Sequence, residues 1–326
     1  MSELTMVQAI NLAMRQEMDR DESVVLIGED VGVDGGIFRV TEGLLDRFGE
    51  ERVIDSPLAE SAIVGVSIGM AIAGLKPIAE MQFSGFSYFA FHQIECHAAR
   101  MRWRSQGRYP VPMVVRMPYG AGVRALEHHS ESREAYYAHT PGLKMVIPST
   151  PRTARALLVS AIRDPDPVIF FEPKLIYRAF REEVSEEEDV LPIGRPRVVR
   201  EGGDVTLISY GAMLHRTIDA ADRLRDQDGV HADIIDLLTI APLDERALAE
   251  SARKTGRVVI VNEAPRSFGP AAEIVARLVE KAFLYLEAPV KRITGYDVPV
   301  PYLAREQAYL PDVDRIVAGV RETLEF

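Results

Sequence analysis

The run Val24-Val25-Leu26-Ile27 is continuously apolar and rich in β-branched residues, and it stops abruptly at Gly28-Glu29-Asp30. A short apolar run of this kind is typical of a strand buried on both faces of a parallel sheet. Helix-like segments lie on either side of it, one ending near Asp19 and the next starting near Thr41. This alternation of strand and helix predicts an α/β fold with parallel sheets.

The same alternation continues along the chain and divides it in two. Acidic residues crowd together between 181 and 202 while the apolar period lapses, which is typical of a solvated linker. We therefore expect a first domain over residues 1–180, a linker over 181–202 and a second domain over 203–326. The expected strands are Val24–Ile27, Val53–Asp55, Pro77–Phe83, Val111–Met117, Met145–Pro148 and Val168–Glu172, then Val205–Ser209, Ala232–Leu238, Val258–Asn262 and Val290–Thr294.

Three helices of the first domain have recognisable starts. Thr5 with Gln8 three residues later predicts a capping box. Ser56-Pro57 predicts an N-cap and a first-turn proline for a helix that ends near Gly74. A third, uninterrupted helix is expected from about Phe86 to Ser105.

Composition excludes several classes of protein. The chain has 326 residues, 38 Lys and Arg against 49 Asp and Glu, and a net charge of −11, so it lacks the basic surface that binds nucleic acid or an anionic membrane. The longest uncharged run, from Ser61 to Leu75, is shorter than the roughly 20 residues of a membrane-spanning helix. Cys96 is the single cysteine, and the N-terminal residues do not resemble a signal peptide. We expect a cytoplasmic protein.

Candidate chemistry is expected just after the strands, because ligands of open parallel sheets bind beyond the carboxyl ends of the strands. Glu60 stands in the first turn of a nearly uncharged helix, so it is either a partly buried acid suited to proton transfer or an exposed acid that complements the helix dipole. His128 and His129 follow a strand and a glycine-rich turn. A histidine in such a loop is either a proton-transfer or substrate residue or a hydrogen-bonded loop histidine.

Two further patterns have weaker functional readings. Gly120-Ala121-Gly122 opens a match to the dinucleotide-binding pattern, but neither the apolar helix nor the acidic residue that the pattern requires follows it. The small residues Gly65, Gly69 and Ala73 share one helix face, which indicates close packing against either another subunit or this chain's own sheet.

A set of motifs in order along the chain resembles one known family, the β subunits of the thiamine-diphosphate-dependent first component of 2-oxo acid dehydrogenase complexes. The resemblance spans almost the full length. Its motifs are Gly28-Glu29-Asp30-Val31-Gly32, Asp55-Ser56-Pro57-Leu58-Ala59-Glu60, Glu80-Met81-Gln82-Phe83, Val115-Arg116-Met117-Pro118, His128-His129-Ser130, Thr140-Pro141-Gly142-Leu143-Lys144, Asp164-Pro165-Asp166-Pro167-Val168 and Gly295-Tyr296-Asp297-Val298-Pro299.

The resemblance implies a fold and a reaction. The fold would consist of two parallel-sheet, three-layer α/β domains, a transketolase-like pyrimidine-binding domain and a transketolase C-terminal-like assembly domain. The reaction would be decarboxylation of pyruvate or a branched-chain 2-oxo acid, followed by reductive acylation of the lipoyl group of the acyltransferase component. The alternatives are the β subunit of an acetoin dehydrogenase, another transketolase-like enzyme, and a non-catalytic α/β binding module.

The resemblance also implies roles for individual residues. Glu60 matches the catalytic carboxylate that hydrogen-bonds the aminopyrimidine ring of thiamine diphosphate, and His129 matches the histidine that reaches the substrate or the lipoyl group. Phe83 and His128 match positions near the substrate. The expected cofactor-binding residues are Glu29, Leu58, Ala59, Gln82 and Phe86. The expected potassium ligands are Met113, Ala161, Ile162, Asp164 and Asp166, with Asp166 standing where the family usually has Asn.

Finally, the resemblance implies a partner. The Gly-Asp-Gly motif that holds magnesium and the diphosphate in the wider family is not found in this sequence. Gly28-Glu29-Asp30 would instead place acids where a diphosphate approaches, which is electrostatically unfavourable. We therefore expect an α subunit to hold the magnesium ion, with the cofactor at the interface of an α2β2 heterotetramer.

Overall fold

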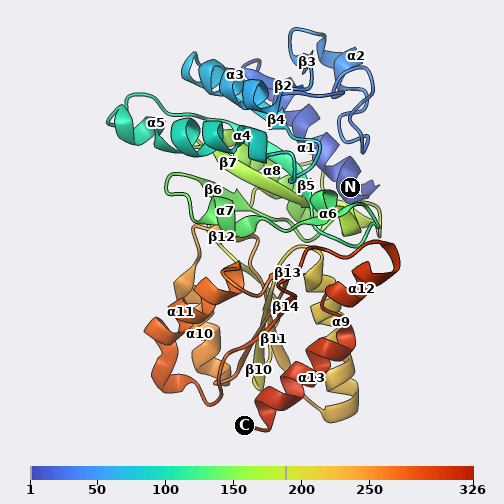
Figure 1. Ribbon diagram of the computed structural model, residues 1–326, viewed down its shortest axis with the longest axis vertical. Coiled ribbons are helices and arrows are strands. Elements are labelled where there is room, and N and C mark those ends of the chain that lie inside the picture. The colour runs from blue at the N-terminus through green and yellow to red at the C-terminus, as the bar shows by residue number, and fades with distance from the viewer. Residues whose placement is uncertain (1, 188) are drawn as a thin grey trace. The chain divides into compact units, whose positions relative to one another are not determined.

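The computed structural model describes residues 2–187 and 189–326, and it consists of two compact units (Figure 1). The first unit comprises Met1–Tyr119 and Tyr136–Ile193, and the second comprises Gly120–Ala135 and Gly194–Phe326. The chain thus passes from one unit to the other three times. The segment Gly120–Ala135 lies inside the range 1–180 expected for the first domain, yet its contacts group it with the second unit.

The first unit is built on a parallel sheet. Its strands run in the order β6-β7-β5-β4-β2-β3, and all five neighbouring pairs are parallel. Side chains on β2, β5 and β7 are buried throughout, as the continuous apolar run predicted. The strands are β2 (Val24–Gly28), β3 (Val53–Asp55), β4 (Lys76–Glu80), β5 (Val114–Tyr119), β6 (Lys144–Val146) and β7 (Val168–Pro173).

Helices flank this sheet in two packed groups (Figure 1). Helix α1 packs on α8, and the Arg163 guanidinium of α8 bonds the Glu17 carboxylate of α1 at 2.7 and 2.8 Å. Helix α3 packs on α4. The predicted capping box of Thr5 and Gln8 is confirmed at the start of α1. The helices are α1 (Met6–Arg20), α2 (Leu44–Phe48), α3 (Glu60–Ile72), α4 (Tyr88–Gln93), α5 (Ala99–Arg104), α7 (Glu134–Ala138), α8 (Pro151–Arg163) and the 3₁₀ turn η2 (Lys174–Ile176).

Two helix predictions were wrong in detail. Helix α3 begins at Glu60 rather than at Ser56-Pro57, because the Ser56 N–H donates to the Gly28 carbonyl at 2.8 Å and keeps the chain extended past β3. The helix expected from Phe86 to Ser105 is interrupted by a π-helical turn, η1 (Ile94–Ala98), between α4 and α5. His92 and His97 are five residues apart, and a π-helical turn brings residues at this spacing close together. The centroids of their rings are 5.4 Å apart.

The segment 181–202 holds two short strands. Strand β8 (Glu182–Val184) pairs antiparallel with β1 (Ser2–Leu4), and Val184 packs against Ala9 and Leu12 of α1. Strand β9 (Arg197–Arg200) joins the sheet of the second unit.

The second unit has a five-stranded sheet in the order β14-β13-β10-β11-β9, parallel except for β9. Helices α10 and α11 pack together, as do α9 and α13, and the two pairs lie on either side of the sheet (Figure 1). Besides β9, the strands of this sheet are β10 (Val205–Ser209), β11 (Ala232–Asp236), β13 (Val258–Pro265) and β14 (Lys291–Gly295), while β12 (Thr239–Ala241) is a short strand outside this sheet. The helices are α6 (Glu127–Ser130), α9 (Met213–Asp228), α10 (Glu245–Thr255), α11 (Pro270–Ala282), η3 (Phe283–Tyr285), η4 (Leu303–Arg305), α12 (Glu306–Tyr309) and α13 (Val313–Leu324).

Candidate functional site

The carboxyl edge of the first sheet is formed where β2, β3 and β4 end side by side. Strand β2 ends at Gly28, where Val31 and Glu80 at the end of β4 lie close to the backbone. A Cβ at residue 28 would lie 2.7 Å from Val31 Cγ1 and 3.0 Å from Glu80 Cβ. Only glycine leaves room for the chain to turn there. The turn directs the next residue, Glu29, toward the start of α3.

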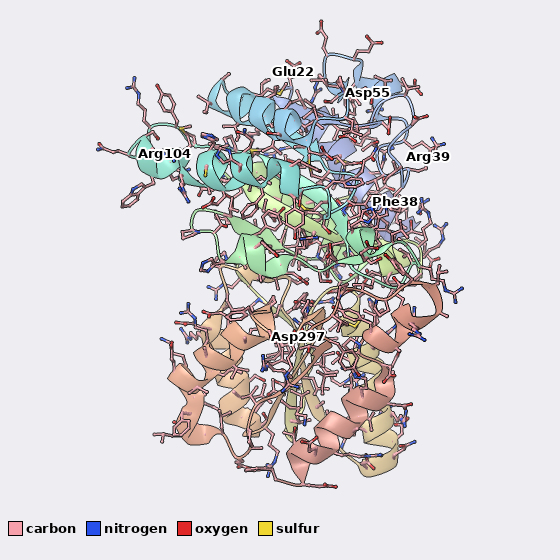
Figure 2. The ribbon with its side chains drawn as sticks, viewed as in Figure 1. Glu22, Phe38, Arg39, Asp55, Arg104 and Asp297 are labelled. Carbon is pink, nitrogen blue, oxygen red and sulfur yellow. The ribbon has the colours of Figure 1, made fainter. Side chains whose placement is uncertain are left out.

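Asp55 at the end of β3 fixes the loop that follows β2 (Figure 2). Its two carboxylate oxygens accept the backbone N–H groups of Gly32 at 2.6 Å and Val33 at 3.0 Å. The Thr41 hydroxyl donates to the Val31 carbonyl of the same loop at 2.7 Å. The two Asp55 bonds are charge-assisted and the Thr41 bond is buried, and together they hold the loop in one conformation.

Glu29 and Glu60 are buried together at this edge, each with 7% of its surface exposed. The Ala59 N–H donates to the Glu29 carboxylate, and Glu60 follows as the first residue of α3. Burial, and then the nearby Glu60 carboxylate, raise the pKa of Glu29. Of the two readings of Glu60, an exposed acid and a partly buried one, the structure shows the buried one.

Glu29 Oε1 is buried and has no hydrogen-bond partner among the residues that the structure describes. A buried acceptor of this kind is costly unless a ligand completes it. In an aminopyrimidine, the amino group would donate to a carboxylate such as Glu29, and a ring nitrogen would share a proton with a carboxyl group such as Glu60. The residues present therefore fit the pyrimidine half of thiamine diphosphate.

The other expected cofactor residues come from the same edge. Leu58 is 80% exposed and Ala59 is the N-cap residue of α3. The Gln82 amide donates to the Asp30 carboxylate at 2.8 Å. Phe86 contacts Phe83 edge-on, with ring centroids 5.7 Å apart.

Phe83 lies at the centre of an aromatic group. Its ring also meets Phe38 edge-on at 5.5 Å, and Lys174 Nζ lies 5.7 Å from its centroid. Phe38, which Figure 2 labels, packs in turn on Tyr177 at 5.3 Å. This group gives the expected substrate residue Phe83 one orientation.

A buried ion-pair network lies beneath this aromatic group. Arg116 on β5 bonds Glu80 on β4 at 2.6 Å and Glu172 on β7 at 2.7 and 3.0 Å, and the Tyr177 hydroxyl donates to Glu172 at 2.5 Å. One guanidinium therefore joins three neighbouring strands just below the site.

The two expected histidines lie in the second unit, on α6. Their rings are 4.1 Å apart, and His128 Nδ1 lies 3.9 Å from Glu127 Oε1. The His129 N–H donates to the Leu126 carbonyl at 3.0 Å. The structure thus gathers Glu29, Glu60 and the aromatic residues in one unit and places the histidines in the other.

The Gly120-Ala121-Gly122 turn binds carboxylates of its own chain. The Ala121 N–H donates to Glu263 at 2.8 Å, and the Gly122 N–H donates to Glu306 at 2.8 Å. Backbone N–H groups that a dinucleotide-binding turn would offer to phosphate are therefore already bonded.

The sequence analysis did not identify Glu263 and Glu306. Glu263 directly follows the strand expected at Val258–Asn262. Candidate residues were expected just after the strands of the first half of the chain, and the same expectation applied to the second half identifies Glu263. No local pattern marks Glu306, which bonds a turn 184 residues away.

The expected potassium ligands lie near the amino end of β7. Lys144 Nζ bonds both oxygens of Asp164 at 2.7 and 2.8 Å, and Arg102 bonds Asp166. The side-chain carboxylates thus already carry protein cations and do not fit a further metal ion. Potassium binding there stays a prediction that rests on backbone carbonyl oxygens. The carbonyls of Met113 and Ala161 accept N–H groups from Val168 and Asp164 at 3.0 and 3.3 Å.

Among residues 2–187 and 189–326, no group of three or more His, Cys, Asp and Glu side chains is arranged to hold a metal ion. In the same residues, no helix has the length and hydropathy that would let it cross a membrane.

The chain matches two families of known domains. Residues 2–179 match the family described as "Transketolase, pyrimidine binding domain", and residues 194–316 match "Transketolase, C-terminal domain". The solved structure titled "Split gene transketolase, inactive beta4 tetramer" superposes with a TM-score of 0.81 at 22% identity, covering 99% of each chain. This likeness establishes the fold.

Curated relatives are similar over their full length. "Pyruvate dehydrogenase E1 component subunit beta" of Acholeplasma laidlawii is 50% identical over 322 residues, which cover 99% of this chain and 98% of that protein. "2-oxoisovalerate dehydrogenase subunit beta" of Bacillus subtilis is 48% identical over 328 residues, with complete coverage of both.

Proposed function

The chain belongs to the family of β subunits of 2-oxo acid dehydrogenase first components, with a transketolase-like fold, and on that premise we propose which half of the active site it supplies. The first unit would bind the aminopyrimidine of thiamine diphosphate. The observation that carries this proposal is the buried pair of carboxylates, Glu29 and Glu60, with Glu29 Oε1 buried and unbonded among the residues that the structure describes.

When bound, thiamine diphosphate supplies the nucleophilic carbon and the electron sink for decarboxylation of a 2-oxo acid. Glu60 would hold and move the proton at a ring nitrogen, because a carboxylate at a buried helix start is fixed in one position. Glu29 would accept a second donor of the ring. Leu58, Ala59, Gln82 and Phe86 would surround the ring, and the apolar side chains of Leu58, Ala59 and Phe86 would exclude water.

We propose that His129 contacts the substrate or the incoming lipoyl group, with His128 and Phe83 beside the substrate. A histidine can donate a hydrogen bond in either protonation state, so it would suit a step in which the lipoyl disulfide opens and its second sulfur takes up a proton. The second unit would therefore contribute a functional residue in addition to its role in assembly.

A separate α subunit would complete the site by holding magnesium and the diphosphate. Glu29, Asp30, Asp55 and Glu60 make the carboxyl edge of the first sheet acidic, and two phosphates placed there would be repelled. The relatives' names, which include "subunit beta", support a partner subunit. We propose an α2β2 heterotetramer that works with a lipoyl-bearing acyltransferase.

The test is Glu60→Gln in the complex assembled with the α subunit. Glutamine keeps the size and a hydrogen bond but cannot exchange the proton, so decarboxylation should fall at least about a hundredfold. Glu51→Gln, at an exposed acid of the same unit, is the matched control and should keep its rate. Near-normal turnover by Glu60→Gln would contradict the role of Glu60.

Assays of the same complex with pyruvate, 2-oxoisovalerate and acetoin separate the remaining readings. Turnover of either 2-oxo acid supports the dehydrogenase, and turnover of acetoin alone supports the acetoin enzyme. A complex that turns over none of the three would support the non-catalytic module.

A further inference from the structure

The segment Gly120–Ala135 begins with an unusual backbone. Gly120, Gly122 and Arg124 have φ angles of +87°, +105° and +58°, the last in a non-glycine residue. A turn with alternating left-handed residues cannot bond its own N–H groups as a helix does, so these groups need acceptors from elsewhere.

Two buried carboxylates of the second unit supply these acceptors. Glu263 accepts the Ala121 N–H at 2.8 Å. Glu306 uses both oxygens, accepting the Gly122 N–H at 2.8 Å and the Arg124 N–H at 2.7 Å. Glu263 and Glu306 are 2% and 0% exposed, so these charge-assisted bonds are not weakened by water.

The glycines around this contact show that the close approach is built into the chain. A Cβ at Gly120 would lie 2.8 Å from both oxygens of Glu263. A Cβ at Gly295 would lie 2.4 Å from the Glu263 carbonyl oxygen and 2.6 Å from the Tyr309 ring. A side chain at residue 120 would collide with the Glu263 carboxylate, and one at residue 295 would collide with the Glu263 backbone and the Tyr309 ring.

The same part of the second unit holds helix α6 at another point. The Tyr302 hydroxyl donates to the Glu127 carboxylate, and Tyr302 lies four residues before Glu306. Helix α6, which carries His128 and His129, therefore lies within a segment whose backbone and side chains are both bonded to the residues 302–306.

We propose that Glu263 and Glu306 are positioning residues for His129, because they fix the turn from which helix α6 starts. This inference rests on the proposed role of His129 in acylation of the lipoyl group. A turn released from its carboxylates would leave decarboxylation intact and slow the step that needs the histidine in place.

The test uses Glu306→Gln in the assembled complex. Glutamine keeps the length and one acceptor oxygen, but its amide nitrogen cannot accept the second backbone N–H. We expect deuterium uptake by peptides covering 120–125 to become at least about tenfold faster, lipoyl acylation to fall about tenfold, and decarboxylation to stay within about twofold. Asp244→Asn, which alters a carboxylate holding the Ala247 N–H at another helix start, should change none of these.

A double-mutant cycle with His129→Ala separates positioning from general structural damage. If Glu306 acts through His129, Glu306→Gln has no further effect on acylation once His129 is alanine. It keeps its full effect when the neighbouring His128 is replaced instead. Glu263→Gln, which alters the acceptor of the Ala121 N–H, gives the same cycle if Glu306→Gln fails to fold.

Distinct outcomes contradict this proposal and the proposed function. Unchanged exchange at 120–125, or an undiminished Glu306→Gln effect in the His129→Ala background, would overturn the positioning role alone. A wild-type complex that decarboxylates 2-oxo acids but never acylates lipoyl groups would overturn the proposed role of His129 and this inference with it.

Discussion

Glu134 is a carboxyl group held in conditions that favour its neutral form. It is fully buried, and Tyr210 donates to its Oε1 at 3.2 Å, while Tyr210 itself accepts from the Asn262 amide at 3.0 Å. Burial is the main reason that the pKa of Glu134 is raised to about 8, and the nearby Glu263 carboxylate also raises it. The residue is therefore mostly protonated at neutral pH.

This raised pKa predicts a specific dependence of stability on pH. The folded chain holds the Glu134 proton up to about pH 8, whereas the unfolded chain releases it near its ordinary pKa of 4.5. The free energy of unfolding should therefore fall as pH rises from about 5 to 8, by about 3–5 kcal/mol from this group. Urea unfolding of wild type and Glu134→Gln over that range measures it.

The glutamine variant should be insensitive to this part of the pH range, because its amide does not ionise. The other ionisable groups are the same in both proteins, so only the difference between the two curves is diagnostic. Parallel curves for wild type and variant would show that Glu134 is ionised in the folded chain at neutral pH.

At the residue scale, the sequence predicted the position of those candidate site residues that lie just after a strand. Glu29 follows β2, and Glu60 begins the helix after β3, so topology alone places them at one edge. The carboxylates that bind the backbone of the segment Gly120–Ala135 could not be predicted in the same way. Glu306 bonds residues far away in the chain, and only the folded arrangement of the second unit brings them together.

At the scale of elements, Arg116 joins β4, β5 and β7 through Glu80 and Glu172. Its side chain is 1% exposed, so removing it leaves carboxylates without a counter-ion inside the sheet. We expect Arg116→Leu to lower the free energy of unfolding by about 3–5 kcal/mol. Circular dichroism during urea unfolding measures the change.

Arg47→Leu is the matched control for this variant. Arg47 makes two bonds of 2.9 Å with Asp19, but the two side chains are 53% and 41% exposed. Its loss should cost about 1 kcal/mol or less. Equal effects of the two variants would show that burial of the Arg116 network does not determine its contribution.

The alternation of apolar runs predicted nearly every buried strand, because parallel strands leave a continuous apolar signal. Elements that depend on distant pairing were missed. Strand β8 exists because β1 lies beside it, and its own sequence, Glu182–Val184, has no apolar alternation. The π-helical turn at Ile94–Ala98 also leaves no local signal that separates it from an ordinary helix.

For the whole molecule, the proposed function predicts that the isolated chain cannot hold its cofactor. On this proposal, the acidic carboxyl edge of the first unit would hold the aminopyrimidine but would repel the diphosphate. Calorimetric titration of the purified chain with thiamine diphosphate and magnesium should show no tight binding, while the complex with the α subunit should bind. Tight, magnesium-dependent binding and turnover by the isolated chain would contradict the half-site proposal.

The return of Gly120–Ala135 to the second unit has a consequence for synthesis on the ribosome. The Arg124 N–H and its acceptor on Glu306 are 182 residues apart, and translation proceeds at about 5–20 residues per second. Roughly ten to forty seconds therefore pass between the synthesis of Arg124 and that of Glu306, and during this time the Arg124 N–H lacks its acceptor. A nascent chain can form its first sheet early, but the turn that precedes His128 and His129 can bond Glu306 only after residue 306 has been made.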